Sequence, residues 1–66
     1  MASEPSAYYQ AVSAADQRLE QALAGLRDRQ YAGEVTPVEA AQERIALLEA
    51  HLAECQAIRR QHLGGA

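Results

Sequence analysis

A single break divides this 66-residue sequence into two halves of similar length. Residues 32 to 39 read Ala-Gly-Glu-Val-Thr-Pro-Val-Glu and separate two long stretches, of which 6 to 31 contains no Pro and one Gly, and 38 to 62 contains neither. Gly33 suits the left-handed residue that ends many helices. Thr36 is a favourable N-cap, and Pro37 fits the first helical position, where its missing N–H costs nothing. Glu39 follows the cap by three residues, which is the spacing of a capping box. This segment therefore predicts the end of one helix and the start of another.

Both halves carry apolar residues at the three- and four-residue spacing of an α-helix. The first half has Tyr8, Val12, Ala15, Leu19, Ala22, Leu23 and Leu26, and the second has Val38, Ala41, Ile45, Leu48, Leu52 and Cys55. We predict an all-α fold, a single antiparallel two-helix hairpin. Its helices cover about residues 6 to 31 and 37 to 62, with a turn at 32 to 36 and a short lead-in before the first helix.

The antiparallel register predicts which side chains meet between the two helices. Leu26 is expected near Ile45, and Leu19 near Leu48 and Leu52. The same register brings two basic residues toward two acidic ones, namely Arg27 and Arg29 toward Glu39 and Glu43.

Further apolar residues fall outside this expected seam and predict an interface with another chain. Leu47 and Ile58 project about 100° away from the Ile45–Leu52 line, at roughly 100° per residue. The full set of predicted interface residues is Leu47, Ile58, Tyr31, Tyr9 and Leu23. A lone hairpin of this length buries too little to offset an ordering entropy of about 1.5 kcal/mol per residue. We therefore expect a homodimer that forms an antiparallel four-helix bundle of coiled-coil type.

Small residues on one flank of the first helix, Ala11, Ala14, Ala22 and Gly25, would allow another helix to approach closely. The alternative for Gly25 is a glycine that the helix tolerates at a cost of about 1 kcal/mol.

The second helix also carries the candidate metal ligands His51, Cys55 and His62 on one flank. His51 and Cys55 are four residues apart, a spacing at which two side chains can share one ion. His62 lies two turns beyond Cys55, too far for the same ion. The ligand set is incomplete, so we expect no cofactor and little effect of zinc on the melting temperature.

Composition and motifs exclude several classes of function. A net charge of −3 argues against an electrostatically driven nucleic-acid binder. A single Cys excludes a disulfide framework within the chain. No apolar run approaches the ~18 residues of a membrane span and no signal peptide opens the chain, so a cytoplasmic location is expected. There is no nucleophile–base set and no Gly-rich phosphate loop, so we predict no catalytic residues and no enzyme.

The turn and the residues after it are similar to a known kind of module. The pattern Gly-x-Val-Thr-Pro-x-Glu-Ala followed by Leu47-Leu48 resembles the short helical-hairpin modules of bacterial proteins, the SHOCT type among them. The resemblance covers about residues 23 to 48. This chain has Ala40-Ala41 where that module places an aromatic residue, and capping chemistry alone accounts for the match.

Three functional hypotheses follow. The first is a small interaction protein that packs against itself and a larger protein through its helices. The second is a metal- or ligand-binding bundle that uses the flank of His51, Cys55 and His62. The third is a small regulator that binds a transcription or sigma factor by helix-in-groove packing.

Overall fold

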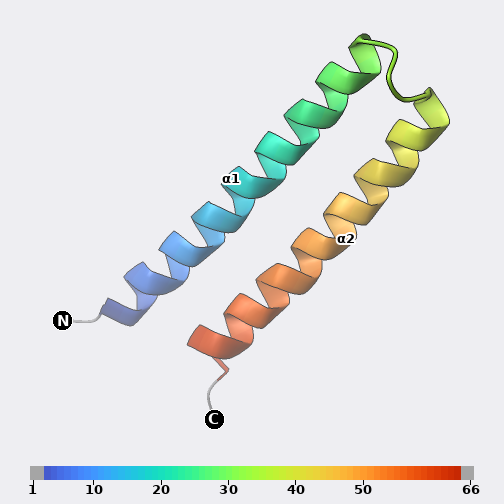
Figure 1. The fold of residues 1–66 in the computed structure, drawn as a ribbon. Helices are drawn as coiled ribbons and strands as arrows, with labels where there is room; N and C mark the ends of the chain where they lie inside the picture. Colours follow the sequence, from blue (N-terminus) through green and yellow to red (C-terminus); the bar gives the residue numbers. More distant parts are fainter. Residues whose placement is uncertain (1–2, 65–66) are drawn as a thin grey trace.

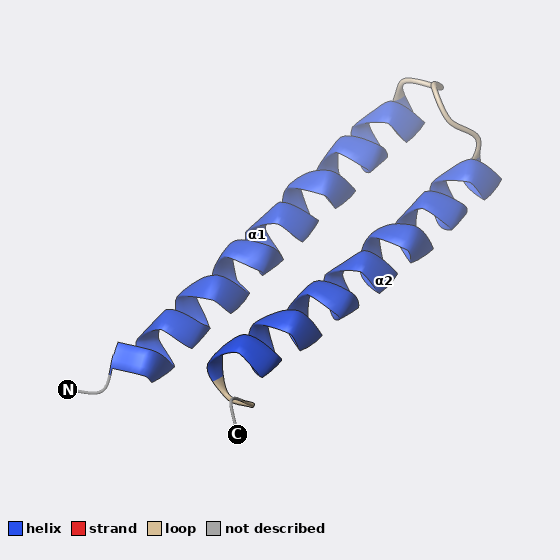
Figure 2. Cartoon of the chain, turned by 60° about the horizontal axis from the view of Figure 1, so that its bottom comes forward, coloured by secondary structure: helices blue, strands red, loops and turns tan. Residues whose placement is uncertain are grey.

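The computed structural model describes residues 3 to 64, which form two long helices joined by a short turn. Helix α1 covers Ser3–Tyr31 and helix α2 covers Pro37–His62. The helices run antiparallel, side by side along their length, so that the start of α1 and the end of α2 lie opposite the turn (Figure 1). The described chain contains no strand (Figure 2). The predicted all-α two-helix hairpin is confirmed.

Helix α1 begins three residues earlier than expected, at Ser3. The residues predicted as a lead-in are therefore partly helical. Pro5 lies in the first turn, where a proline removes no intrahelical hydrogen bond because the first N–H groups of a helix have no partner within it.

The turn is held by the capping chemistry that its residues predict. Gly33 adopts φ 79°, and the N–H of Glu34 bonds to the carbonyl of Arg29 at 2.9 Å, which is the pattern of a Schellman motif. The N–H of Glu39 donates to Thr36 Oγ1 at 3.1 Å. The N–H of Thr36 donates to Glu39 Oε1 at 2.9 Å. This reciprocal pair completes the predicted capping box.

The seam between the helices has a small core. Among the residues whose side chains are described, Ala15, Leu26 and Ala40 are buried, and Leu26 is the one large side chain that is fully enclosed. The Cα trace measures 50 × 20 × 8 Å along its principal axes, so the molecule is a single layer of helices. Each helix therefore contacts only one neighbour and exposes both of its flanks.

Ion pairs cross the seam on either side of this core. Arg29 pairs with Glu43 near the turn, as the antiparallel register predicts, and Arg18 pairs with Glu54 further along. These side chains are between 38% and 58% exposed, so each pair contributes about 0–1 kcal/mol. Charge pairing thus defines the register more than it stabilises the hairpin.

The predicted face of α2 at the seam was wrong. Ile45, Leu48 and Leu52 were expected to pack against α1, but they are 57%, 46% and 59% exposed. Leu47 instead lies opposite α1, where it lines a hollow together with Ala15, Leu19, Ala22 and His51. Ile58, eleven residues further along, is half-buried on the same line of the helix.

A rotation of about 100° explains this error. It brings Glu43, His51 and Glu54 to the seam, where each meets a charged side chain of α1, and Ala40 to a position where the helices can approach closely. The apolar periodicity identifies the most apolar face of α2, but the hairpin packs through a different face, which carries Leu47 and Ile58.

Neither helix has a stretch that is both long and apolar enough to cross a membrane, within the residues described.

Candidate functional site

A strip of large apolar side chains runs along the outside of α2. It consists of Val38, Ile45, Leu48 and Leu52, which are 66%, 57%, 46% and 59% exposed. We call these four residues the α2 strip. Positions three, four and seven apart lie on one side of a helix, so the four side chains form a continuous row. Such a row on a small protein marks a surface for association.

Residues of α1 extend this surface across the hairpin. Tyr9, Asp16 and Leu23 are seven residues apart, so successive members lie within about 20° of one another on the helix. Asp16 contacts His51, which lies on the flank of α2 between the seam and the α2 strip, so this row of α1 is on the same side of the hairpin as that flank. Tyr9 is 68% exposed and Leu23 is half-buried. The α2 strip, Tyr9 and Leu23 therefore lie on one face of the hairpin, which we call the apolar face.

The five residues predicted as an interface have different positions in the hairpin. Tyr9 and Leu23 lie on the apolar face, and Tyr31 is 86% exposed at the end of α1. Leu47 and Ile58 are half-buried toward α1. Whether any of the five contacts another chain stays a prediction.

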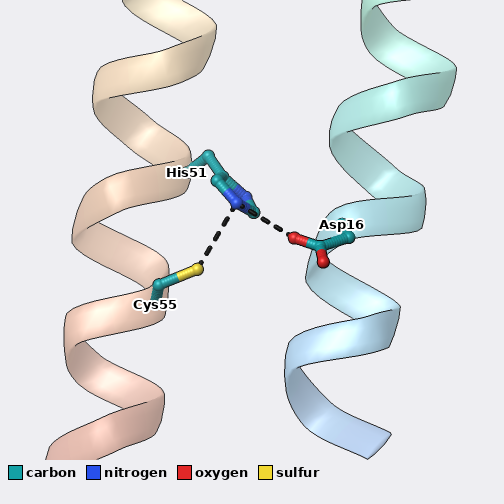
Figure 3. Close-up of side chains that lie close together, drawn as sticks. All are labelled: Asp16, His51 and Cys55. Atoms are coloured by element: carbon teal, nitrogen blue, oxygen red, sulfur yellow. Dashed lines mark hydrogen bonds and ion pairs between the residues drawn. The ribbon is translucent and has the colours of Figure 1, made fainter. Parts of the chain in front are cut away.

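A polar cluster lies between the two rows of the apolar face, near the middle of the hairpin. His51 and Cys55 come from adjacent turns of α2, and Asp16 reaches across from α1 (Figure 3). The Nε2 atom of His51 is 3.1 Å from Asp16 Oδ1 and 3.4 Å from Cys55 Sγ. The three donor atoms lie within 4.8 Å of one another. We call this group the Asp16–His51–Cys55 cluster.

The imidazole of His51 is held through one of its two nitrogens. Both polar contacts are made by Nε2, while Nδ1 is buried and has no hydrogen-bond partner among the described residues. A catalytic Cys–His–Asp arrangement uses opposite ring nitrogens for the thiol and the carboxylate. Because Asp16 and Cys55 share one nitrogen, the cluster lacks that relay and instead directs three ligand atoms toward one point.

The structure separates the third predicted metal ligand from this cluster. The ring of His62 lies near the ring of Tyr8, with centroids 6.3 Å apart in an edge-on arrangement. Asp16 is the third member of the cluster instead of His62. Residue spacing within α2 could not identify it, because Asp16 belongs to α1. The antiparallel register brings residue 16 of α1 level with the turns of α2 around residue 51, which is the part of the signal that the sequence contains; the rotation of the two helices then decides that Asp16 meets His51.

A second hollow lies near the turn, with a volume of about 410 Å³. It is lined by Arg27, Gln30, Tyr31 and Arg44. Three of these side chains are exposed and Gln30 is half-buried. We assign no ligand to this hollow, because these polar groups remain solvated.

Comparison of the chain with models of protein families, with curated proteins and with solved structures found no match. The apolar face and the Asp16–His51–Cys55 cluster are therefore the features from which a function can be inferred.

Proposed function

We propose that the protein is a small, non-enzymatic association module of the cytoplasm whose partner is a second copy of itself. The α2 strip carries this proposal: the most continuous apolar row of α2 points away from α1. Two hairpins would pack apolar face to apolar face as an antiparallel four-helix bundle.

The small core of the hairpin supports a partner. Among the residues whose side chains are described, three are buried and two of these are alanine, which provides little hydrophobic stabilisation for a hairpin of this size. The α2 strip offers four more side chains, each about half exposed. Covering them would contribute about 1 kcal/mol for each side chain. A second copy would thus supply the enclosed core that one layer of helices lacks.

Symmetry supports a second copy of the chain as the partner. A twofold pairing buries the same face on both copies and leaves no apolar strip for further growth. This twofold pairing uses only the apolar face and requires no other surface of the hairpin. A larger protein bound to the same face is the competing arrangement.

The experiment compares two double variants that add the same charges. Ile45→Glu with Leu52→Glu places two carboxylates seven residues apart on the α2 strip. The control, Ala46→Glu with Ala53→Glu, has the same spacing but lies about 100° around the helix, at two exposed alanines. All four sites are exposed in the single hairpin, so neither variant disturbs its seam.

Sedimentation and circular dichroism at micromolar concentration give the readout. We expect dimers for the wild type and for the control, and monomers with reduced helix content for Ile45→Glu/Leu52→Glu. A wild-type monomer with full helix content would contradict the proposal. Capture of one defined larger protein by that monomer, abolished in Ile45→Glu/Leu52→Glu alone, would assign the face to a different partner.

A further inference from the structure

We propose that the Asp16–His51–Cys55 cluster is a binding site for one divalent zinc-class metal ion per chain. All three ligands come from a single hairpin. The site is therefore independent of the dimer proposed above, although it lies on the same face.

The two donor separations from His51 Nε2 are close to those around a tetrahedral ion. Zinc lies about 2.0–2.1 Å from imidazole nitrogen, about 2.3 Å from thiolate sulfur and about 2.0–2.2 Å from carboxylate oxygen. At tetrahedral angles these lengths place nitrogen and sulfur about 3.6 Å apart, and nitrogen and oxygen about 3.4 Å apart. The observed separations from His51 Nε2 are 3.4 Å to Cys55 Sγ and 3.1 Å to Asp16 Oδ1. The same geometry requires Cys55 Sγ and an Asp16 oxygen about 3.6 Å apart. All three donor atoms lie within 4.8 Å of one another, so these two side chains would approach by up to about 1 Å to share the ion.

The chemistry of the three donors selects the class of metal. A thiolate and an imidazole favour zinc and its neighbours among the transition metals, whereas magnesium and calcium prefer oxygen ligands alone. Three protein ligands leave the fourth tetrahedral position to water. On binding, the Cys55 thiol releases its proton and His51 binds through the Nε2 lone pair.

The fold holds the ligands in place before any ion arrives. His51 and Cys55 are one turn apart on the same helix, so their separation is set by the backbone. Asp16 is positioned from the other helix, next to Ala15, which is fully buried. The neighbouring pair of Arg18 and Glu54 aligns the two helices at the same level. An ion at this point would link α1 to α2 and stabilise the hairpin.

This inference reverses the expectation from sequence that zinc has little effect. That expectation rested on His62 as the third ligand, which is too far along α2. A side chain of α1 completes the set instead, and it becomes visible only when the helices are packed.

Titration of the reduced protein with Co²⁺ tests the site, because a thiolate ligand adds a charge-transfer band and tetrahedral geometry strengthens the visible bands. We expect saturation at one cobalt per chain, displacement by zinc, and a melting temperature that rises with zinc. Cys55→Ser should abolish the charge-transfer band. Asp16→Asn, which keeps the side-chain shape, should weaken cobalt binding at least tenfold.

His62→Gln is the matched control, because it removes the other histidine and should leave the titration unchanged. Circular dichroism of each variant without metal shows whether it is folded. The absence of a charge-transfer band in the folded wild type would overturn the proposal. So would Asp16→Asn binding cobalt as tightly as the wild type, or one cobalt bound per two chains.

Discussion

Thr36 and Glu39 show how far single residues can be interpreted from sequence. Their spacing predicts a capping box, and both of its hydrogen bonds are present. The prediction succeeds because capping depends on residues within one turn of chain, and no distant contact is needed.

The capping box also predicts how substitutions at Thr36 change the stability of the protein. Thr36→Ala removes the oxygen that accepts from the N–H of Glu39 and should lower the free energy of unfolding by about 1 kcal/mol. Thr36→Ser keeps the hydroxyl and should lose much less. Urea unfolding followed by circular dichroism gives both values. Equal losses in the two variants would show that the hydroxyl does not stabilise α2.

The role of Asp16 in the cluster could not be predicted from its own position in the sequence. Alone it is an exposed acid on a helix, one of nine acidic residues in the chain. Its place beside His51 depends on the register and on the rotation of both helices about their axes. Sequence predicts the register from the turn, but it does not predict that rotation.

At the scale of the helix, α2 explains why the rotation escaped prediction. Its apolar row of Ile45, Leu48 and Leu52 and its seam row of Leu47 and Ile58 are about 100° apart, and both carry large side chains. Helical periodicity favours the row of Ile45, Leu48 and Leu52 as the face that packs against α1, because this row is the more continuous. The hairpin packs through the second row, where polar side chains also find partners across the seam. To predict which row packs against α1, one must know which side chains of α1 it meets. The sequence of α2 alone does not contain that information.

The two flanks of α1 differ, because one belongs to the apolar face and the other carries Gly25. A substitution at Gly25 tests whether a partner covers this second flank. Gly25 lies seven residues after Arg18, so it occupies the flank that meets Glu54, away from the apolar face. A Cβ added at Gly25 would meet nothing within 4 Å among the described residues. Gly25→Ala should therefore raise the free energy of unfolding by about 1 kcal/mol, because alanine favours helix more than glycine does.

Urea unfolding and sedimentation of Gly25→Ala measure this effect, and the association state should not change. The alternative from sequence was that Gly25 allows close approach of another helix. A loss of stability or a change in association in Gly25→Ala would support that alternative and place a partner on the Arg18 flank.

At the scale of the whole molecule, the hairpin separates two kinds of interaction. Polar pairs, small residues and the side chains of Leu26, Leu47 and Ile58 join α1 to α2, while the α2 strip remains outside. A chain that folded alone would place its best apolar row inside. The proposed four-helix bundle would cover this exposed row.

The last prediction follows from that arrangement. If folding and dimerisation are coupled, mass action makes the stability depend on protein concentration. Each tenfold increase should add about 1.4 kcal/mol per mole of dimer to the free energy of unfolding. Urea midpoints, measured with a chelator present so that metal binding does not contribute, should therefore rise between micromolar and hundredfold higher concentration. Ile45→Glu/Leu52→Glu should lose this dependence, and Ala46→Glu/Ala53→Glu should keep it. A wild-type midpoint that is constant over that range would mean that one hairpin is stable by itself, despite the small core around Leu26.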